Sequence, residues 1–267
     1  MHHTARFLAV CGILFLFLGS TGIAVSYAYF VNGESASLVI GQPDFTTSTC
    51  VSSPPTKTGL CGSVWFTFDN AGNLWVADAG NNRVLRFKTP FSTLEAASMV
   101  IGQPDFTSGS CATTQNGLCN PKGIAFDSSG NLWVGDRGNS RILEFKAPLS
   151  SGQGASLVLG QTSFTTSACS TTQSGLCNPI GIAFGPAGNV WISDGTNNRV
   201  LKFNAPFSNG ELASRVIGQS DFTASTCATT QSGLCNPVDV GFDSSGNLWV
   251  SDLNNNRVLS YLRLTSD

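Results

Sequence analysis

The side chains most able to do chemistry recur at fixed positions in this chain. Each of four similar segments carries an aspartate and, five residues later, an arginine. This pairing favours a charge-assisted hydrogen bond that pins a turn. One ligand rarely needs four equivalent sites, so we expect structural ion pairs at Asp78/Arg83, Asp136/Arg141, Asp194/Arg199 and Asp252/Arg257.

The N-terminal 28 residues are typical of an export signal. Arg6 precedes an uncharged run over residues 7–33, and Ser26-Tyr27-Ala28 offers a small-x-small site for cleavage after Ala28. A retained signal-anchor is the alternative, because the apolar stretch is long enough to span a bilayer. We therefore expect a secreted or cell-surface protein that contacts the membrane only through an uncleaved N-terminal segment.

The cysteines predict disulfides rather than a metal site. Beyond Cys11, in the apolar run, eight cysteines remain, two in each repeat. An even count, local spacing and an export signal favour an oxidising compartment. No C-x-x-C spacing occurs, and both histidines, His2 and His3, precede the repeats, which disfavours zinc. We expect no metal and no cofactor, and four bonds: Cys50–Cys61, Cys111–Cys119, Cys169–Cys177 and Cys227–Cys235.

The repeat determines the architecture. Gly41, Gly102, Gly160 and Gly218 close similar runs at spacings of 61, 58 and 58 residues, giving repeats of about 36–96, 97–154, 155–212 and 213–267 within residues 29–267. In the second unit, short runs at 123–127, 131–136, 142–146 and 156–159 alternate with turn residues. Four short antiparallel strands per repeat are typical of a β-propeller blade.

Other recurring residues fit turns and packing. Asp69, Asp127 and Asp243 open D-x-x-G-N turns, where the aspartate accepts backbone hydrogen bonds and glycine supplies a positive φ. No such turn has the dense oxygen set of a calcium loop. We expect core packing from the period-matched tryptophans Trp75, Trp133, Trp191 and Trp249.

A longer motif resembles a known family. The run from Pro121 to Phe145, with Gly130-Asn131-Leu132-Trp133, Asp136 and Arg141, is similar to the NHL-repeat signature, and its core recurs in the other three repeats. The resemblance implies an all-β propeller of four NHL-type, four-stranded blades. Two departures are the Cys-bearing insert and the blade number, because NHL propellers most often have six blades.

The ends of the chain leave two arrangements open. The chain begins with a fourth-type strand at 37–40 and ends with a third-type strand at 258–262. We expect the opening strand to complete the last blade, because this closure removes a free sheet edge. The alternative is an open propeller, in which that strand completes the next molecule's last blade and produces a larger ring or filament.

A ligand site is expected where the copies differ. The start of the first strand of each blade, near the mouth of the central channel, varies between repeats, as does the loop after the second strand. An aromatic ring, two cations and a carboxylate at this opening would form a small recognition site made of Trp65, Lys122, Arg137 and Asp239.

Composition reduces the number of function classes that fit this chain. A net charge of −2, with only 11% charged residues, argues against nucleic acid as a partner. Catalysis is disfavoured without a histidine after the signal. The NHL resemblance includes metal-dependent lyases, so a hydrolase- or lyase-like enzyme is one alternative. We expect a non-enzymatic extracellular binding or scaffold module for a protein or polysaccharide, and self-assembly into a surface structure or filament is the other alternative.

Overall fold

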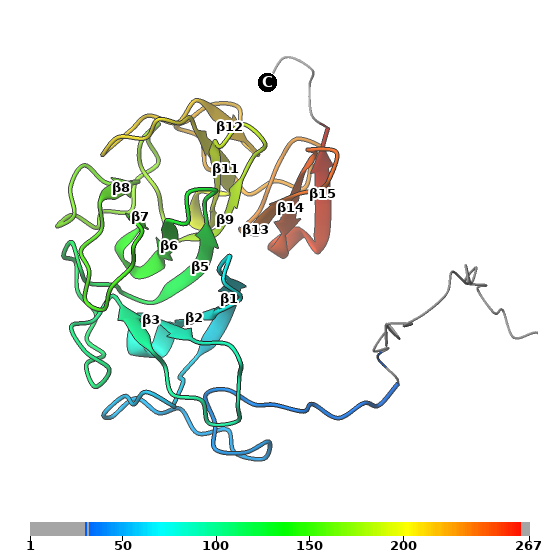
Figure 1. Cartoon of the computed structure of the whole chain (residues 1–267). Coiled ribbons are helices and arrows are strands. Elements are labelled where there is room, and N and C mark those ends of the chain that lie inside the picture. Colours follow the sequence, from blue (N-terminus) through cyan, green and yellow to red (C-terminus); the bar gives the residue numbers. More distant parts are fainter. Residues whose placement is uncertain (1–29, 31, 263–267) are drawn as a thin grey trace, which may run out of the picture. The chain divides into compact units, whose positions relative to one another are not determined.

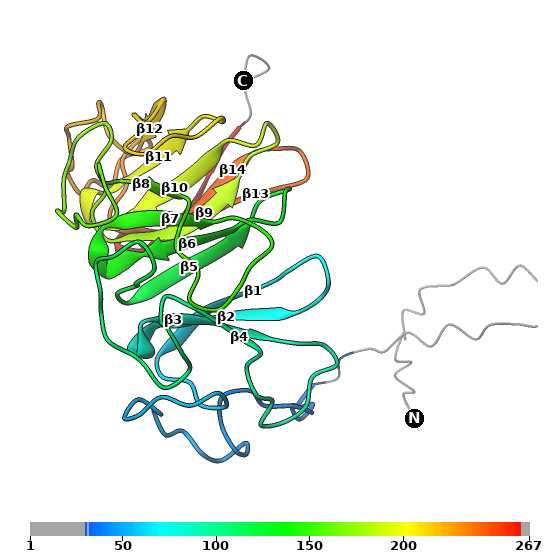
Figure 2. The same cartoon turned by 60° about the vertical axis from the view of Figure 1, so that its left-hand side comes forward.

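Four antiparallel sheets follow one another along the chain in the computed structural model (Figures 1 and 2). The structure describes residues 30 and 32–262, and one compact unit begins at Leu38. The expected signal, at residues 1–28, lies outside the described residues. None of the helical turns in the described ranges is long and apolar enough to cross a membrane.

Each sheet, here called a blade, takes its first three strands from one repeat, and the fourth strand of each complete blade comes from the start of the next repeat. Blade 1 contains β1 (Ser63–Phe68), β2 (Leu74–Asp78), β3 (Arg83–Phe87) and β4 (Met99–Ile101). Blade 2 contains β5 (Pro121–Phe126), β6 (Leu132–Asp136), β7 (Arg141–Phe145) and β8 (Leu157–Leu159). Blade 3 contains β9 (Pro179–Phe184), β10 (Val190–Asp194), β11 (Arg199–Phe203) and β12 (Arg215–Ile217). Blade 4 contains β13 (Pro237–Phe242), β14 (Leu248–Asp252) and β15 (Arg257–Tyr261).

Local sequence accounts for the turns within a blade. In blade 2, Asp127 Oδ1 accepts the backbone N–H groups of Ser129 and Asn131, and Gly130 adopts a φ of 80°. A one-turn 3₁₀ helix, η2 (Arg137–Asn139), then links β6 to β7 and ends at Ser140 in the left-handed region. Equivalent turns, η1 (Ala79–Asn81), η3 (Gly195–Asn197) and η4 (Leu253–Asn255), occupy the other blades.

The core lies between blades, not within them. Alternation along β2 turns Trp75 and Ala77 toward blade 2, where they pack with Ile124 and Leu132 in one buried cluster. The Trp75 ring meets Phe126 edge-on at 5.5 Å, and Trp133–Phe184 and Trp191–Phe242 repeat this contact at the next two boundaries. Each blade therefore needs the next one to bury its tryptophan.

The inner strands approach so closely that glycine is required at two positions. A Cβ atom on Gly123 would lie 2.0 Å from the carbonyl oxygen of Ile180, and one on Gly181 would lie 2.8 Å from the Cα of Asp239. These contacts place β5 against β9 and β9 against β13. Within the described residues, β13 and β1 make no comparable contact, so the stack has two ends.

The all-β fold of NHL-type blades is confirmed, but the expected closure of the last blade is wrong. Blade 4 has three strands, and no N-terminal segment in the described ranges pairs with β15. Instead, the backbone N–H of Val39 donates to Thr93 Oγ1 at 3.5 Å, and its carbonyl accepts the N–H of Leu94 at 3.4 Å. These bonds hold Leu38–Ile40 beside blade 1, as β4 is held beside blade 2. This unit therefore matches the alternative arrangement, an open propeller.

Adding a methyl group between blades 2 and 3 tests this packing. We expect Gly123→Ala to lower the free energy of unfolding by about 1–3 kcal/mol, because the new Cβ would overlap the Ile180 carbonyl. Gly241→Ala is the matched control, since its Cβ would meet nothing within 4 Å and we expect a change below about 0.5 kcal/mol. Urea unfolding of the disulfide-intact proteins measures both, and equal losses would contradict the close approach.

Candidate functional site

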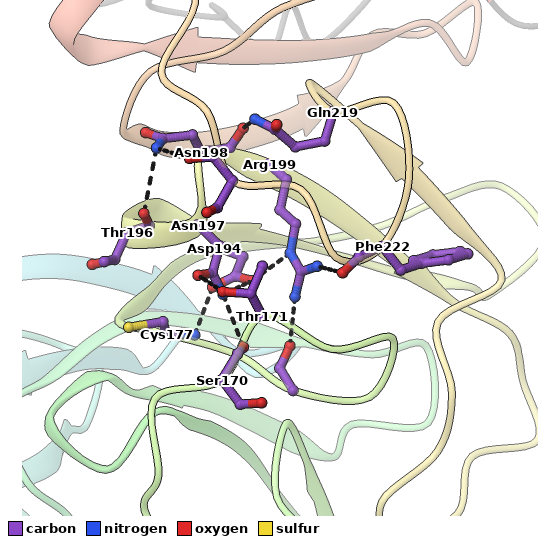
Figure 3. Close-up of polar contacts among 12 residues, drawn as sticks. Ser170, Thr171, Cys177, Asp194, Thr196, Asn197, Asn198, Arg199, Gln219 and Phe222 are labelled. Carbon is purple, nitrogen blue, oxygen red and sulfur yellow. Dashed lines mark hydrogen bonds and ion pairs between the residues drawn. The ribbon is translucent and has the colours of Figure 1, made fainter.

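A buried carboxylate organises the turn between the second and third strands of each blade, and Figure 3 shows the one in blade 3. In blade 3, Asp194 Oδ2 accepts Nε of Arg199 and Nδ2 of Asn197, both at 2.8 Å, and its Oδ1 accepts the N–H of Cys177 at 2.6 Å. Burial raises the pKa of Asp194 to about 6, although the Arg199 charge and these donors act to lower it. The carboxylate is thus fully occupied by donors from its own repeat.

The paired guanidinium extends this network to two other loops. Arg199 Nη2 donates to the carbonyls of Thr172 and Gly175, each at 2.9 Å, and Nη1 donates to the carbonyl of Phe222. Thr172 and Gly175 precede blade 3, whereas Phe222 belongs to the loop that leads into blade 4. One side chain therefore ties a blade to the loops on both sides of it.

The other three ion pairs named from the sequence form in the same way. Their Nε–Oδ2 distances are 2.7 Å in blades 1 and 2 and 2.8 Å in blade 4. The arginine and aspartate side chains are fully buried in blades 1 to 3, but that of Arg257 in blade 4 is 24% exposed. In blades 1 and 2, acceptors in the same repeat and in the loop that follows bond all three guanidinium nitrogens, which accounts for these pairs without a ligand.

The disulfides close the loops whose backbone carbonyls accept hydrogen bonds from the arginines. Thr172 and Gly175 lie between Cys169 and Cys177, whose Cα atoms are 4.4 Å apart. The other three bonds are Cys50–Cys61, Cys111–Cys119 and Cys227–Cys235. Fixing such a loop in the unfolded chain is worth about 2–3 kcal/mol in the chain-entropy treatment. The insert therefore presents two carbonyls in a fixed position to the guanidinium.

The structure brings together only part of the ligand site expected from the sequence. Lys122 is half-buried near Arg137, and burial, followed by the Arg137 charge, lowers the pKa of the Lys122 ammonium. Asp239 lies against Gly181, and burial raises the pKa of its carboxyl group. Trp65 instead packs beside the apolar cluster between blades 1 and 2. No hydrogen bond or ion pair described here joins Asp239 to either cation.

A different surface, missed by sequence reasoning, lies at the start of the stack. We call it the leading face, and it forms a pocket of about 480 Å³ on blade 1. Phe66 and Phe68 are 67% and 53% exposed there. Its lining is apolar and consists of Ile40, Leu60, Trp65, Phe66, Phe68, Leu74 and Val76.

The other end of the stack has a matching surface. Trp249, expected in the core, is 44% exposed, and Val258 on β15 is 63% exposed. We call these two residues the trailing face. Their counterparts Trp191 and Val200 are buried against blade 4. The signal that would have revealed both faces is the Trp–Phe pairing between successive repeats. Within the described residues, this pairing leaves Trp249 without a phenylalanine and Phe68 without a tryptophan.

The Trp249 ring is oriented by a hydrogen bond. Its indole Nε1 donates to Asp243 Oδ2 at 3.0 Å, and Asn247 donates to the same oxygen at 2.9 Å. These bonds, that of Trp249 first, lower the pKa of Asp243 to about 2. The exposed ring is therefore held in place before any partner arrives.

The sheets and the boundaries between them define a β-propeller with an open stack of blades. The NHL repeat family matches residues 118–145, 176–203 and 234–261, which contain the first three strands of blades 2 to 4. The chain therefore contains NHL repeats, which form blades of the β-propeller type. Among the described residues, no group of three or more His, Cys, Asp or Glu is arranged to hold a metal ion.

Comparison with individual proteins adds distant relatives. The mouse peptidyl-glycine alpha-amidating monooxygenase is 25% identical over 139 residues, which cover 51% of this chain and 14% of that protein. A structural genomics protein from Bacteroides thetaiotaomicron has a TM-score of 0.52 at 18% identity, covering 75% of this chain and 47% of that one. Virginiamycin B lyase from Staphylococcus aureus has a TM-score of 0.44 at 15% identity, covering 75% of this chain and 55% of that one. The chain thus spans about half the length of these solved structures.

Removing one guanidinium tests the network. We expect Arg199→Met to lower the free energy of unfolding by about 3–5 kcal/mol, because it leaves Asp194 buried without its charge partner. Arg257→Met is the matched control, and we expect a smaller loss because water already reaches that side chain. Urea midpoints of the two variants check this, and equal losses would contradict a role for the contact with the next blade.

The bond that orients Trp249 predicts a pH dependence. Because the folded pKa of Asp243 is about 2, against 3.8 as the ordinary value, its stabilising contribution is complete above about pH 4 and is lost as the pH falls toward 2. Trp249→Phe removes the indole donor, so we expect the pKa to rise toward 3.8. Carboxyl ¹³C titration by NMR measures this change, and an unmoved pKa would show that the indole bond is not its main cause.

Proposed function

We propose that the chain is an exported, non-catalytic binding and scaffold module that binds a protein partner through its two end faces. The observation that carries this proposal is Trp249, which is 44% exposed although its three counterparts are buried by a following blade. Exposed aromatic rings on rigid elements are the side chains that most often dominate protein–protein binding. Each end face is thus a docking surface of the kind that the fold itself uses three times.

A protein partner fits these surfaces better than a polysaccharide does. The leading face is an apolar pocket lined by aromatic and aliphatic side chains. The trailing face continues into β15, a sheet edge whose backbone groups can bond an added strand. The four disulfides support an oxidising, extracellular location.

The similarity to the mouse amidating monooxygenase keeps an enzymatic role as the second candidate. That similarity covers 14% of the mouse protein, and it is the observation that favours this role. The binding role is preferred because both histidines, His2 and His3, precede the repeats, which therefore supply no imidazole base. Turnover of a substrate by the purified chain, lost on Asp239→Ala, would favour the enzyme instead.

Photo-crosslinking from the trailing face tests the proposal. The full chain carrying p-benzoylphenylalanine in place of Trp249 is irradiated in the medium of the cells that secrete it, and we expect a crosslinked protein partner. The same group in place of Leu212, which is 59% exposed outside both end faces, is the control. Mass spectrometry identifies the partner.

Three results would contradict the proposed role. The first is that position 249 gives no protein adduct, and the second is that both positions give equal amounts of adduct. The third is that an insoluble polysaccharide retains the chain and that neither substitution changes this retention. The last result would instead assign the partner to the polysaccharide class.

A further inference from the structure

The internal boundaries between blades share a set of recurring contacts, two of which occur at all three boundaries. The tryptophan of one blade meets a phenylalanine of the next, as Trp191 meets Phe242. The arginine Nη1 donates to a phenylalanine carbonyl in the following loop, as Arg83 donates to Phe106 at 2.6 Å. At the first two boundaries, the outer strand of one blade also bonds to a loop of the next: the N–H of Gly152 donates to the carbonyl of Val100 at 3.1 Å, and that of Gly210 to the carbonyl of Val158 at 3.2 Å.

Within residues 32–262, blade 4 lacks all of these partners. Its tryptophan, Trp249, has no phenylalanine against it among the described aromatic contacts. Nη1 of Arg257 has no acceptor in the described part of the chain, whereas its Nε and Nη2 are bonded as in the other blades. The edge strand β15 has no fourth strand beside it in that same part of the chain. The trailing face is therefore an unfinished blade boundary.

Blade 1 carries the missing half of that boundary. Phe68 occupies the position of Phe126 and Phe242 in the repeat and is 53% exposed. Phe45 occupies the position of Phe106, so its carbonyl is the counterpart of the one that Arg83 bonds. Leu38–Ile40 occupies the position of an outer strand and is already held beside blade 1 through Val39.

We propose that the partner of the trailing face is the leading face of a second copy of this chain, joined head to tail. This inference rests on the proposed function and specifies which protein binds the trailing face. In each complete blade the third and fourth strands pair in one register, for example Val200↔Ile217, Leu201↔Val216 and Lys202↔Arg215. Aligning the repeats gives the corresponding pairs between the two copies, which are Val258↔Ile40, Leu259↔Val39 and Ser260↔Leu38.

The same transfer assigns the other contacts between copies. Trp249 stacks edge-on against Phe68 of the second copy, and Arg257 Nη1 donates to the carbonyl of its Phe45. Asn256 aligns with Asn82, whose carbonyl accepts Nε2 of Gln103 at 2.8 Å. The carbonyl of Asn256 therefore accepts the amide of Gln42 in the second copy. Because this contact joins different faces, it repeats at every copy and forms a ring or a fibre.

Mixed-cysteine crosslinking tests the register. The full chain with Leu38→Cys is mixed with the full chain with Ser260→Cys, and residues opposite each other on paired strands lie within reach of a disulfide. We expect a disulfide-linked dimer in the mixture and none with either variant alone. Ser245→Cys, at an exposed turn of blade 4, replaces Ser260→Cys in the control mixture, where we expect no dimer.

The mixture also separates this proposal from closure within one chain. A bond between chains that carry one new cysteine each cannot form within one molecule. No dimer in the mixture, together with a fast-migrating monomer of the Leu38→Cys/Ser260→Cys double variant, would overturn the proposal in favour of self-closure. Mass spectrometry of the four native disulfides establishes that each variant has folded.

Light scattering measures the assembly directly. We expect the unmodified full chain to form species larger than a monomer, and Trp249→Asp to raise their dissociation constant about tenfold or more. Leu212→Asp, which alters neither end face, should leave it unchanged. If the unmodified chain stays monomeric up to about 100 μM, well above the micromolar dissociation constants of specific association, the proposal is overturned. If position 249 then still crosslinks to another protein, only the identity of the occupant has failed, and the binding function stands.

Discussion

One guanidinium in each repeat connects three parts of the chain that are distant in sequence. Arg141 bonds Asp136 in its own blade, the carbonyls of Thr114 and Gly117 in the preceding disulfide loop, and the carbonyl of Phe164 in the loop that follows. A charge buried this deeply is tolerated because each of its donors finds an acceptor. The cysteine-bearing insert is therefore part of the fold's support, and the spacing between its carbonyls and the blade is constrained by that one side chain.

Sequence reasoning recovered what is local and periodic. The strands, turns, cysteine pairs and the Asp–Arg spacing each depend on residues within one repeat, so their pattern recurs four times and can be read directly. The burial of Trp249 depends instead on a neighbouring blade. Position-matching predicted it in the core, because the pattern of one repeat does not say whether another repeat follows. Closure failed as a prediction for the same reason, since Leu38–Ile40 bonds blade 1 instead of β15.

Position in the stack also explains part of the variation once assigned to a ligand. Gly123 and Gly181 are followed by a blade whose backbone leaves no room for a Cβ atom. Asp239 occupies the same position in blade 4, where no blade follows in the described residues, and a side chain fits. Differences among repeats therefore record steric surroundings as well as function, and Trp65 both lines the leading face and packs beside the cluster between blades 1 and 2.

The Trp–Phe and Arg–carbonyl contacts between blades are made from positions that recur in all four repeats. A duplication of residues 155–212 would insert a 58-residue unit whose two sides already match its neighbours. The lengthened protein would need no compensating substitution and would present the same pair of end faces. The identical stretches at 171–179 and 229–237 are the kind of record that such copying leaves. The number of blades in a gene of this design is thus free to drift while its surfaces of attachment are inherited intact.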